Sequence, residues 1–207
     1  MCHPIFFRSC NPAGNWYQWG ILYGSRSNPK PQYPNTQTRL KDAFKRVIKI
    51  FTDNKAPVQF QLNINANNGY DDKTPFATWW PGTVGLSSVA ITAYNRACST
   101  PSHQDSKPFR DRFSAAYNQV KALTPLPIWV AETGTTSCKT DKPTWVKEAF
   151  RDIALLFPQV VQVTWFLTDK LQEGVVTDWD MHDGTKVSAL HYACLCALTL
   201  QDLIQLD

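Results

Sequence analysis

Among the side chains that could do chemistry, one carboxylate stands in an informative place. Glu132 closes the apolar run of the segment Pro127-Ile-Trp-Val-Ala-Glu-Thr-Gly134, and a glycine follows it two residues later. An apolar strand that ends in an acid is how a parallel β-barrel presents a catalytic carboxylate at its mouth. Such a carboxylate could take part in cleaving a glycosidic bond, a reaction that normally uses two carboxylates flanking the bond.

The sequence offers no obvious second carboxylate for this reaction. The chain has only 3 Glu, and its first acidic residue is Asp42. A distant acid such as Asp71 or Asp178 could reach in, but nothing in the sequence places either at the separation of about 5–5.5 Å that a retaining mechanism requires. On residue type alone, a helix cap or an ion pair with a lysine is the commoner use of a strand-end Glu.

Strands and helices that alternate along the chain must position Glu132. This alternation is typical of an α/β domain with a parallel sheet. Strands are predicted over residues 4–10, 58–64, 84–92, 128–131 and 160–167, and a last helix over residues 186–204. Three further helices are predicted from apolar residues at helical spacing: Leu40, Phe44, Val47, Ile48 and Phe51; Phe109, Phe113, Ala116, Tyr117 and Val120; Val146, Phe150, Ile153 and Phe157.

Composition narrows the possible partners. The 207 residues suffice for one well-buried domain, and 8 Trp favour sugar stacking as well as ordinary cores. The net charge of +4 is too small to indicate binding to nucleic acid or to an anionic membrane. The basic face of residues 39–49 is interpreted as the solvated surface of a helix. No apolar stretch has the length of a membrane-spanning helix, and no signal peptide is recognised. The 4 His are scattered, so no metal or cofactor is expected.

The cysteines leave the disulfide pattern open. An even count of 6 allows 15 pairings. Cys98 and Cys138 each follow one of two adjacent predicted strands, so a disulfide between the two loops is possible in an oxidising compartment. Cys194 and Cys196 are expected to be buried thiols of the last helix.

Three segments together resemble glycoside hydrolase family 26, whose best-known members are β-mannanases. Residues 7–19, Phe-Arg-Ser-Cys-Asn-Pro-Ala-Gly-Asn-Trp-Tyr-Gln-Trp, resemble the family's fourth-strand motif, Arg-x-x-His-Glu-Met-Asn-Gly-x-Trp-Tyr-x-Trp. Residues 80–95 resemble the sixth strand, with its Tyr-Pro-Gly entrance and Tyr-Asn exit. Residues 127–134 resemble the seventh strand, with its Ala-Glu-x-Gly, and residues 163–166 fit the eighth.

The resemblance implies a partial (β/α)8 barrel. Residues 1–207 would form a single domain that supplies barrel strands four to eight and lacks the first three βα units. The expected architecture is an open, curved parallel sheet with helices on its outer side. A closed barrel typically takes about 250 residues, which agrees with a chain that holds five such units.

The resemblance also implies a nucleophile without its proton donor. Glu132 matches the nucleophile of the family. Counted from Arg8, the family's His-Glu pair becomes Asn11-Pro12; counted back from Trp16, it becomes Cys10-Asn11. No carboxylic acid remains in either alignment, and general acid catalysis typically contributes about 10²–10⁴-fold.

Further matches imply a sugar-binding surface. Tyr94 matches a tyrosine that sits beside the nucleophile and can hydrogen-bond to it. Trp16 and Trp165 match aromatics of the subsite that holds the cleaved sugar. Trp79 and Trp80 lie in a loop predicted at the same end of the sheet and are candidates for further sugar contacts. Arg8 matches an arginine with either a structural or a substrate-binding role. Each of these aromatic residues, taken alone, would be read as core packing.

Two function classes follow. The first is a retaining endo-glycosidase acting on β-mannan-type polysaccharides, whose activity in this chain depends on another proton donor. The second is a non-catalytic carbohydrate-binding pseudoenzyme, or an inactive fragment. The partner in either case is a polysaccharide or oligosaccharide. The resemblance implies an extracellular protein, and xylan and mixed-linkage glucan are alternative substrates within the family; the oligomeric state is left open.

Overall fold

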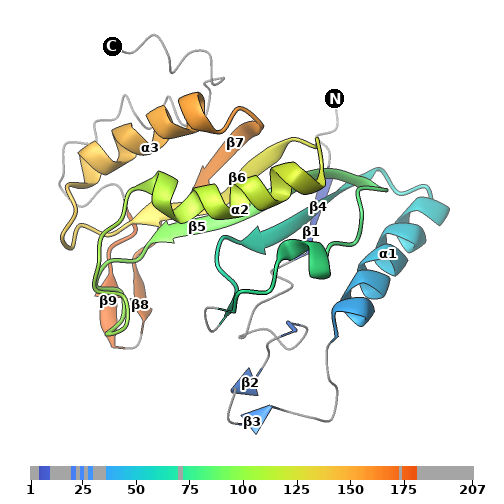
Figure 1. Ribbon diagram of the computed structural model, residues 1–207, viewed down its shortest axis with the longest axis horizontal. Coiled ribbons are helices and arrows are strands. Elements are labelled where there is room, and N and C mark those ends of the chain that lie inside the picture. Colours follow the sequence, from blue (N-terminus) through green and yellow to red (C-terminus); the bar gives the residue numbers. More distant parts are fainter. Residues whose placement is uncertain are drawn as a thin grey trace. The chain divides into compact units, whose positions relative to one another are not determined.

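The computed structural model describes residues 5–9, 20–21, 24–25, 28–29, 36–69, 72–172 and 174–180. Its main sheet has five strands in the order β1-β4-β5-β6-β7, and β2-β3 and β8-β9 form two small sheets (Figure 1). The chain divides into two compact units, Met1–Ile91 with Ala116–Ile128, and Thr92–Ala115 with Trp129–Asp207. The boundary passes through β5 (Leu86–Asn95) and α2 (Phe109–Leu123), so both elements contribute to each unit.

The first unit is built on a parallel strand pair. Strand β1 (Ile5–Ser9) pairs with β4 (Val58–Asn65), starting with Ile5 opposite Val58. The small strands β2 (Gly24–Ser25) and β3 (Asn28–Pro29) pair antiparallel, and a short 3₁₀ helix, η2, spans Phe76–Thr78.

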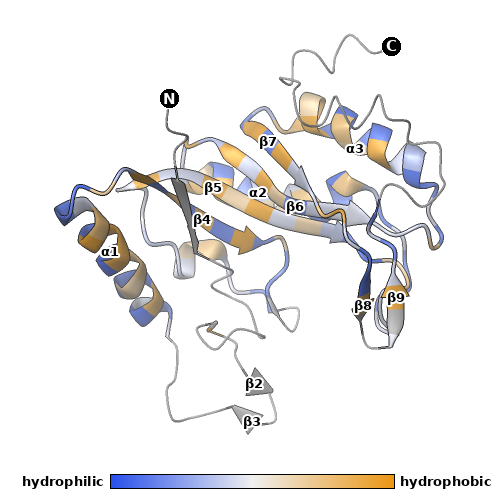
Figure 2. Ribbon diagram, turned by 180° about the vertical axis from the view of Figure 1, so that it is seen from behind, coloured by the Kyte–Doolittle hydropathy of each residue, from blue (hydrophilic) through white to orange (hydrophobic). Residues whose placement is uncertain are grey.

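Helix α1 (Gln37–Asp53) follows in the same unit, and its sequence explains both its start and its packing. Thr36 caps it by accepting a hydrogen bond from the backbone N–H of Arg39 at 3.2 Å. Apolar and polar residues alternate around the helix (Figure 2), and its apolar side buries Phe44 and sets Phe51 edge-on to Phe60 of β4.

Aromatic rings form the core of the second unit. Strands β6 (Ile128–Thr135) and β7 (Val160–Trp165) flank helix α3 (Lys142–Leu156) along the chain. Phe109 stacks on Phe113 of α2 with ring centroids 4.9 Å apart, and both rings contact Phe157 at the end of α3. A hairpin of β8 (Lys170–Gln172) and β9 (Val175–Thr177) follows, and Gly174 turns it with a φ of 81°.

The α/β class, with its parallel sheet and helices, is confirmed, whereas barrel closure and the family's strand numbering stay predictions. Several boundaries were predicted wrongly. Strand β5 begins at Leu86, after the 92 % exposed Val84, and β6 continues to Thr135, so Glu132 lies within the strand instead of ending it. The hairpin of β8 and β9 was not predicted, because each of its strands has only three residues. Phe150 is only partly buried, and Trp145 and Ala149 take its expected place in the core.

The predicted last helix, residues 186–204, lies outside the described residues. Within the described part of the chain, no helix is both long and apolar enough to span a membrane.

Candidate active site

The centre of the candidate site is a hydrogen-bonded pair of side chains from adjacent strands. The Tyr94 hydroxyl, on β5, donates to Oε2 of Glu132, on β6, at 2.9 Å. Both side chains are partly exposed. The two strands neighbour each other in the sheet, so residues near their carboxyl ends come together there. Within the described residues Glu132 forms neither a helix cap nor an ion pair with lysine.

Two aromatic rings pack against the ring of Tyr94. The Tyr94 ring lies 4.9 Å from the Trp179 ring and 6.2 Å from the ring of Phe166, measured between centroids. Burial raises the pKa of Tyr94 far above its usual value, and the charge of Glu132 and the hydrogen bond to it raise that pKa further. At neutral pH Tyr94 therefore keeps its proton and can donate a hydrogen bond to the carboxylate.

The packing around residue 134 explains why a glycine stands there, two residues after Glu132. A Cβ placed on Gly134 would lie 3.2 Å from Cε3 of Trp179 and 3.4 Å from Cδ1 and Cε1 of Tyr94. Side chains at i and i+2 of a strand share one face, so Gly134 lies on the same face of β6 as Glu132. The missing side chain lets both rings lie close against the strand beside the carboxylate.

Trp165 lies at the end of β7 and is partly exposed. Its indole N–H donates to the backbone carbonyl of Trp179 at 3.1 Å, and its ring contacts that of Trp145 edge-on, with centroids 5.9 Å apart. These contacts fix the orientation of the Trp165 ring. A partly exposed, oriented indole is suited to stacking against a pyranose face.

Asp178, considered above as a distant acid, is held elsewhere. Its carboxylate accepts the backbone N–H of Ser137, at 3.0 Å to Oδ2, and pairs with Lys142 at 3.1 Å. Burial alone would raise the pKa of Asp178, but the hydrogen bonds from Ser137 and Lys142 and the charge of Lys142 outweigh it and lower that pKa. Asp178 is thus an ionised structural group and not a proton donor. Asp71 lies outside the described residues.

The opposite face of the same strands carries a different polar cluster. The amide nitrogen of Asn95 lies 2.8 Å from Thr135 Oγ1, 3.1 Å from Ser106 Oγ and 3.2 Å from Thr140 Oγ1. Its amide oxygen accepts the backbone N–H of Lys107 at 2.9 Å. Asn95 is fully buried, so this cluster ties the loops that follow β5 and β6.

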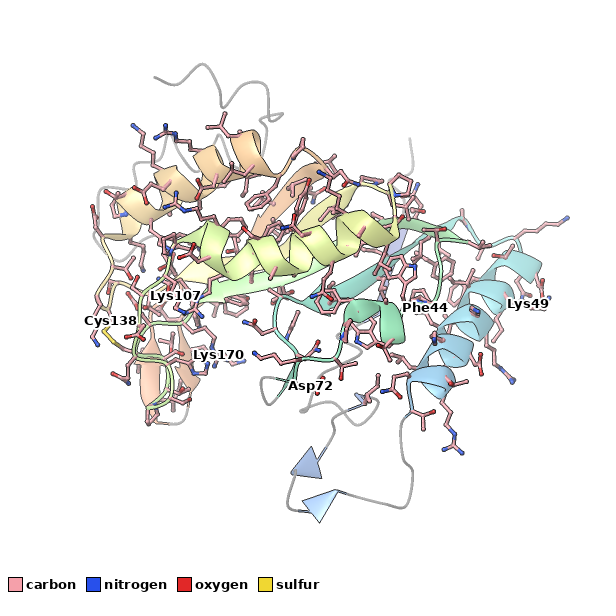
Figure 3. All side chains as sticks on the ribbon, viewed as in Figure 1. Phe44, Lys49, Asp72, Lys107, Cys138 and Lys170 are labelled. Atoms are coloured by element: carbon pink, nitrogen blue, oxygen red, sulfur yellow. A yellow bond between two sulfur atoms is a disulfide. The ribbon has the colours of Figure 1, made fainter. Side chains whose placement is uncertain are left out.

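A disulfide joins the same two loops, as the sequence allowed. Cys98 and Cys138 are bonded, with their Cα atoms 6.0 Å apart, and the sulfur bond is visible beside Cys138 in Figure 3. Thr136 adds a hydrogen bond of 2.7 Å from its hydroxyl to the carbonyl of Ala97. The disulfide and this hydrogen bond join the loops that follow β5 and β6.

The structure describes only some of the remaining predicted site residues. Trp80 belongs to the first unit and is partly exposed; Trp79 beside it is 2 % exposed and packs on Phe76, so the prediction that Trp79 contacts sugar is wrong. Arg8 lies on β1 in register with Gln61. Asn11, Pro12 and Trp16 lie outside the described residues.

Two residues that the structure brings to the site, Trp179 and Lys142, have no assigned role in the sequence-based prediction. Asp178 was considered only as a distant acid, and Trp179 beside it was given no role. Lys142 was passed over, although its place directly before Pro143 at a helix start was a usable signal. Among the described residues no three His, Cys, Asp or Glu side chains cluster as metal ligands would.

Comparison with known proteins supports a glycosidase relationship. No protein-family model matches the chain. Over 189 residues, 90 % of its length, the chain is 27 % identical to Endoglucanase H of Acetivibrio thermocellus. It spans only 19 % of that protein, so it corresponds to a small part of it.

Proposed function

We propose that this chain carries a glycoside-hydrolase-type site of the family 26 kind, built on a partial (β/α)8 barrel and directed to β-mannan-type polysaccharides. The observation that carries the proposal is the hydrogen bond between Tyr94 and Glu132. The similarity to an endoglucanase supports the general class. The choice of mannan comes from the resemblance of the three strand segments alone.

Glu132 acts as the nucleophile in this proposal. One carboxylate oxygen attacks the anomeric carbon, the bond from that carbon to the leaving oxygen breaks, and a covalent glycosyl ester forms. Tyr94 keeps its proton, because its pKa is raised far above neutrality, and so orients the carboxylate without serving as the acid. Trp165 offers a ring for the sugar next to the cleaved bond.

The leaving oxygen still requires a proton. Asn11 and Pro12 at the acid position cannot donate one as a carboxylic acid does, and Asp178 is ionised and bound to Lys142. Loss of the general acid slows cleavage by about 10²–10⁴-fold. This favours, as the second candidate, a non-catalytic carbohydrate binder that keeps the aromatic surface and the carboxylate.

Glu132→Gln separates the two candidates. We expect wild-type hydrolysis of mannan, if present, to fall at least about 10³-fold in this variant, because the amide cannot form the ester. Glu148→Gln, an exposed position on α3, is the matched control. Reducing-sugar release from mannan, xylan and mixed-linkage glucan measures turnover, and calorimetric titration with mannooligosaccharides measures binding.

The outcomes are distinct. Hydrolysis abolished by Glu132→Gln supports the enzyme. Saturable oligosaccharide binding without hydrolysis, weakened by Trp165→Ala, supports the binder. Activity or binding restricted to xylan or glucan would overturn the mannan assignment, and the absence of both activity and binding for all three polysaccharides would overturn the proposal as a whole.

A further inference from the structure

Lys142 occupies an unusual position for a lysine. It is the first residue of α3, where the helix dipole disfavours a positive charge. Its side chain is also completely buried, with 0 % exposure. A buried ammonium group is tolerated only where paired charges and hydrogen bonds offset its lost hydration. The contacts of Lys142 therefore indicate what keeps it there.

Three contacts of Lys142 Nζ lie in the segment that follows the β8–β9 hairpin. Lys142 Nζ lies 3.1 Å from Oδ2 of Asp178 and donates to the backbone carbonyls of Asp178 at 2.9 Å and Asp180 at 2.7 Å. A single ammonium group thus binds the chain on both sides of Trp179.

Residues outside α3 also form hydrogen bonds with this segment. The carboxylate of Asp178 accepts the backbone N–H of Ser137, and the backbone N–H of Asp180 donates to Oδ1 of Asp169 at 3.0 Å. The Trp179 carbonyl accepts the Trp165 indole. The peptide that carries the Trp179 side chain is therefore fixed on each side, with Lys142 as its central anchor.

The side chain fixed in this way forms one wall of the candidate site. Trp179 is 3 % exposed, and its ring packs on Tyr94 and over Gly134. Tyr94 in turn donates to Glu132. Displacement of the Trp179 ring would open space beside the Tyr94 ring, and the hydroxyl could then leave its position on the carboxylate.

We propose that Lys142 is a positioning residue for the Tyr94–Glu132 pair, acting through Trp179. The buried ammonium holds residues 178–180, the held segment seats the Trp179 ring against Gly134, and that ring sets the orientation of Tyr94. The consequence for sugar binding rests on the proposed function; the structural coupling from Lys142 to Trp179 does not.

The test follows the Trp179 ring directly by ¹⁹F NMR of the full chain labelled with 5-fluorotryptophan. Trp179→Phe assigns the signal that belongs to Trp179. Lys142→Met should shift or broaden that signal, because the segment loses its anchor. Lys147→Met, the same substitution at an exposed site of the same helix, should leave it unchanged.

A second variant protects the test against misfolding. Lys142→Met leaves Asp178 without its cation, whereas Lys142→Met combined with Asp178→Asn leaves no charge of the pair behind. The double variant still lacks the bonds to the carbonyls of residues 178 and 180, so the Trp179 signal should move in it as well. An unchanged Trp179 signal in either folded variant would overturn the proposal.

Oligosaccharide titration of the same variants adds the functional part. Residues that act through others change binding by about three- to thirtyfold, and we expect such a loss for Lys142→Met and none for Lys147→Met. Normal affinity together with a displaced Trp179 signal would overturn the link to sugar binding. If wild-type protein binds no sugar at all, the proposed function fails while the NMR comparison still decides the role of Lys142.

Discussion

Tyr94 and Asn95 are consecutive residues of β5 whose side chains serve opposite faces of one strand. Asn95 is fully buried, and its amide engages three hydroxyls and a backbone N–H. Tyr94 and its partner Glu132 are partly exposed and share one hydrogen bond. A buried polar group whose hydrogen-bond partners all lie within the protein stabilises the fold. A partly exposed carboxylate oxygen can also accept a hydrogen bond from a bound ligand.

The two faces also differ in how they respond to change. The Asn95 face is reinforced by the disulfide between Cys98 and Cys138. The Glu132 face depends on fitted rings, with Trp179 and Tyr94 lying against Gly134. Alterations on the first face should therefore lower stability, and alterations on the second should change binding or catalysis more than stability.

Removal of the disulfide should give the largest loss of stability. A bridge across a sequence separation of 40 residues restricts the unfolded chain, and we expect Cys98→Ser with Cys138→Ser to lower the free energy of unfolding by about 4 kcal/mol. Urea unfolding with and without a reductant measures it. Reductant should destabilise the wild-type protein and have no effect on the double variant. An equal effect on both would mean that another pairing carries the stability.

Asn95→Ala should have the next largest effect. The substitution removes several buried hydrogen bonds at once, each with a net value of about 1 kcal/mol, so the free energy of unfolding should fall by about 2–3 kcal/mol. Asn118→Ala, at an exposed site of α2, is the control and should be nearly neutral. A stable Asn95→Ala protein that has lost sugar binding would reverse the contrast between the two faces.

The sequence predicted the α/β class and the buried sides of the helices, because apolar periodicity reports which side of an element is buried. Phe44, Phe113 and Ile153 lie in the core as their spacing predicted. Boundaries were less predictable. Polar residues after Ala131 suggested the end of a strand, but β6 continues to Thr135, because hydrogen bonds to neighbouring strands extend it regardless of local preference.

The candidate site was predictable only in part, for a similar reason. Tyr94 and Glu132 stand at recognisable positions of their segments, and the structure adds the bond between them. The partnership of Lys142 with Asp178 spans 36 residues and carries no local signal beyond a cation at a helix start. Trp179 lies after a hairpin whose strands have only three residues each, too few for an alternating pattern to be recognised.

Tyr94→Phe should have the smallest effect on stability and tests the contrast most finely. At pH 7 the variant loses one partly exposed hydrogen bond, so the free energy of unfolding should change by less than about 1 kcal/mol, while sugar binding or turnover weakens because Glu132 loses its orienting donor. A larger loss of stability with unchanged sugar binding would make Tyr94 a structural residue like Asn95.

The alkaline range gives the same variant a second signature. Burial, and then the charge of Glu132, raise the pKa of Tyr94 in the folded protein, whereas an unfolded tyrosine ionises near pH 10. Above that pH the folded state binds more protons at this residue than the unfolded state, so wild-type stability should fall as pH rises. Tyr94→Phe should show a shallower decline, and Glu132→Gln an intermediate one, because burial remains when the charge is gone. Identical alkaline declines in all three proteins would show that Tyr94 is not held in its neutral form beside Glu132.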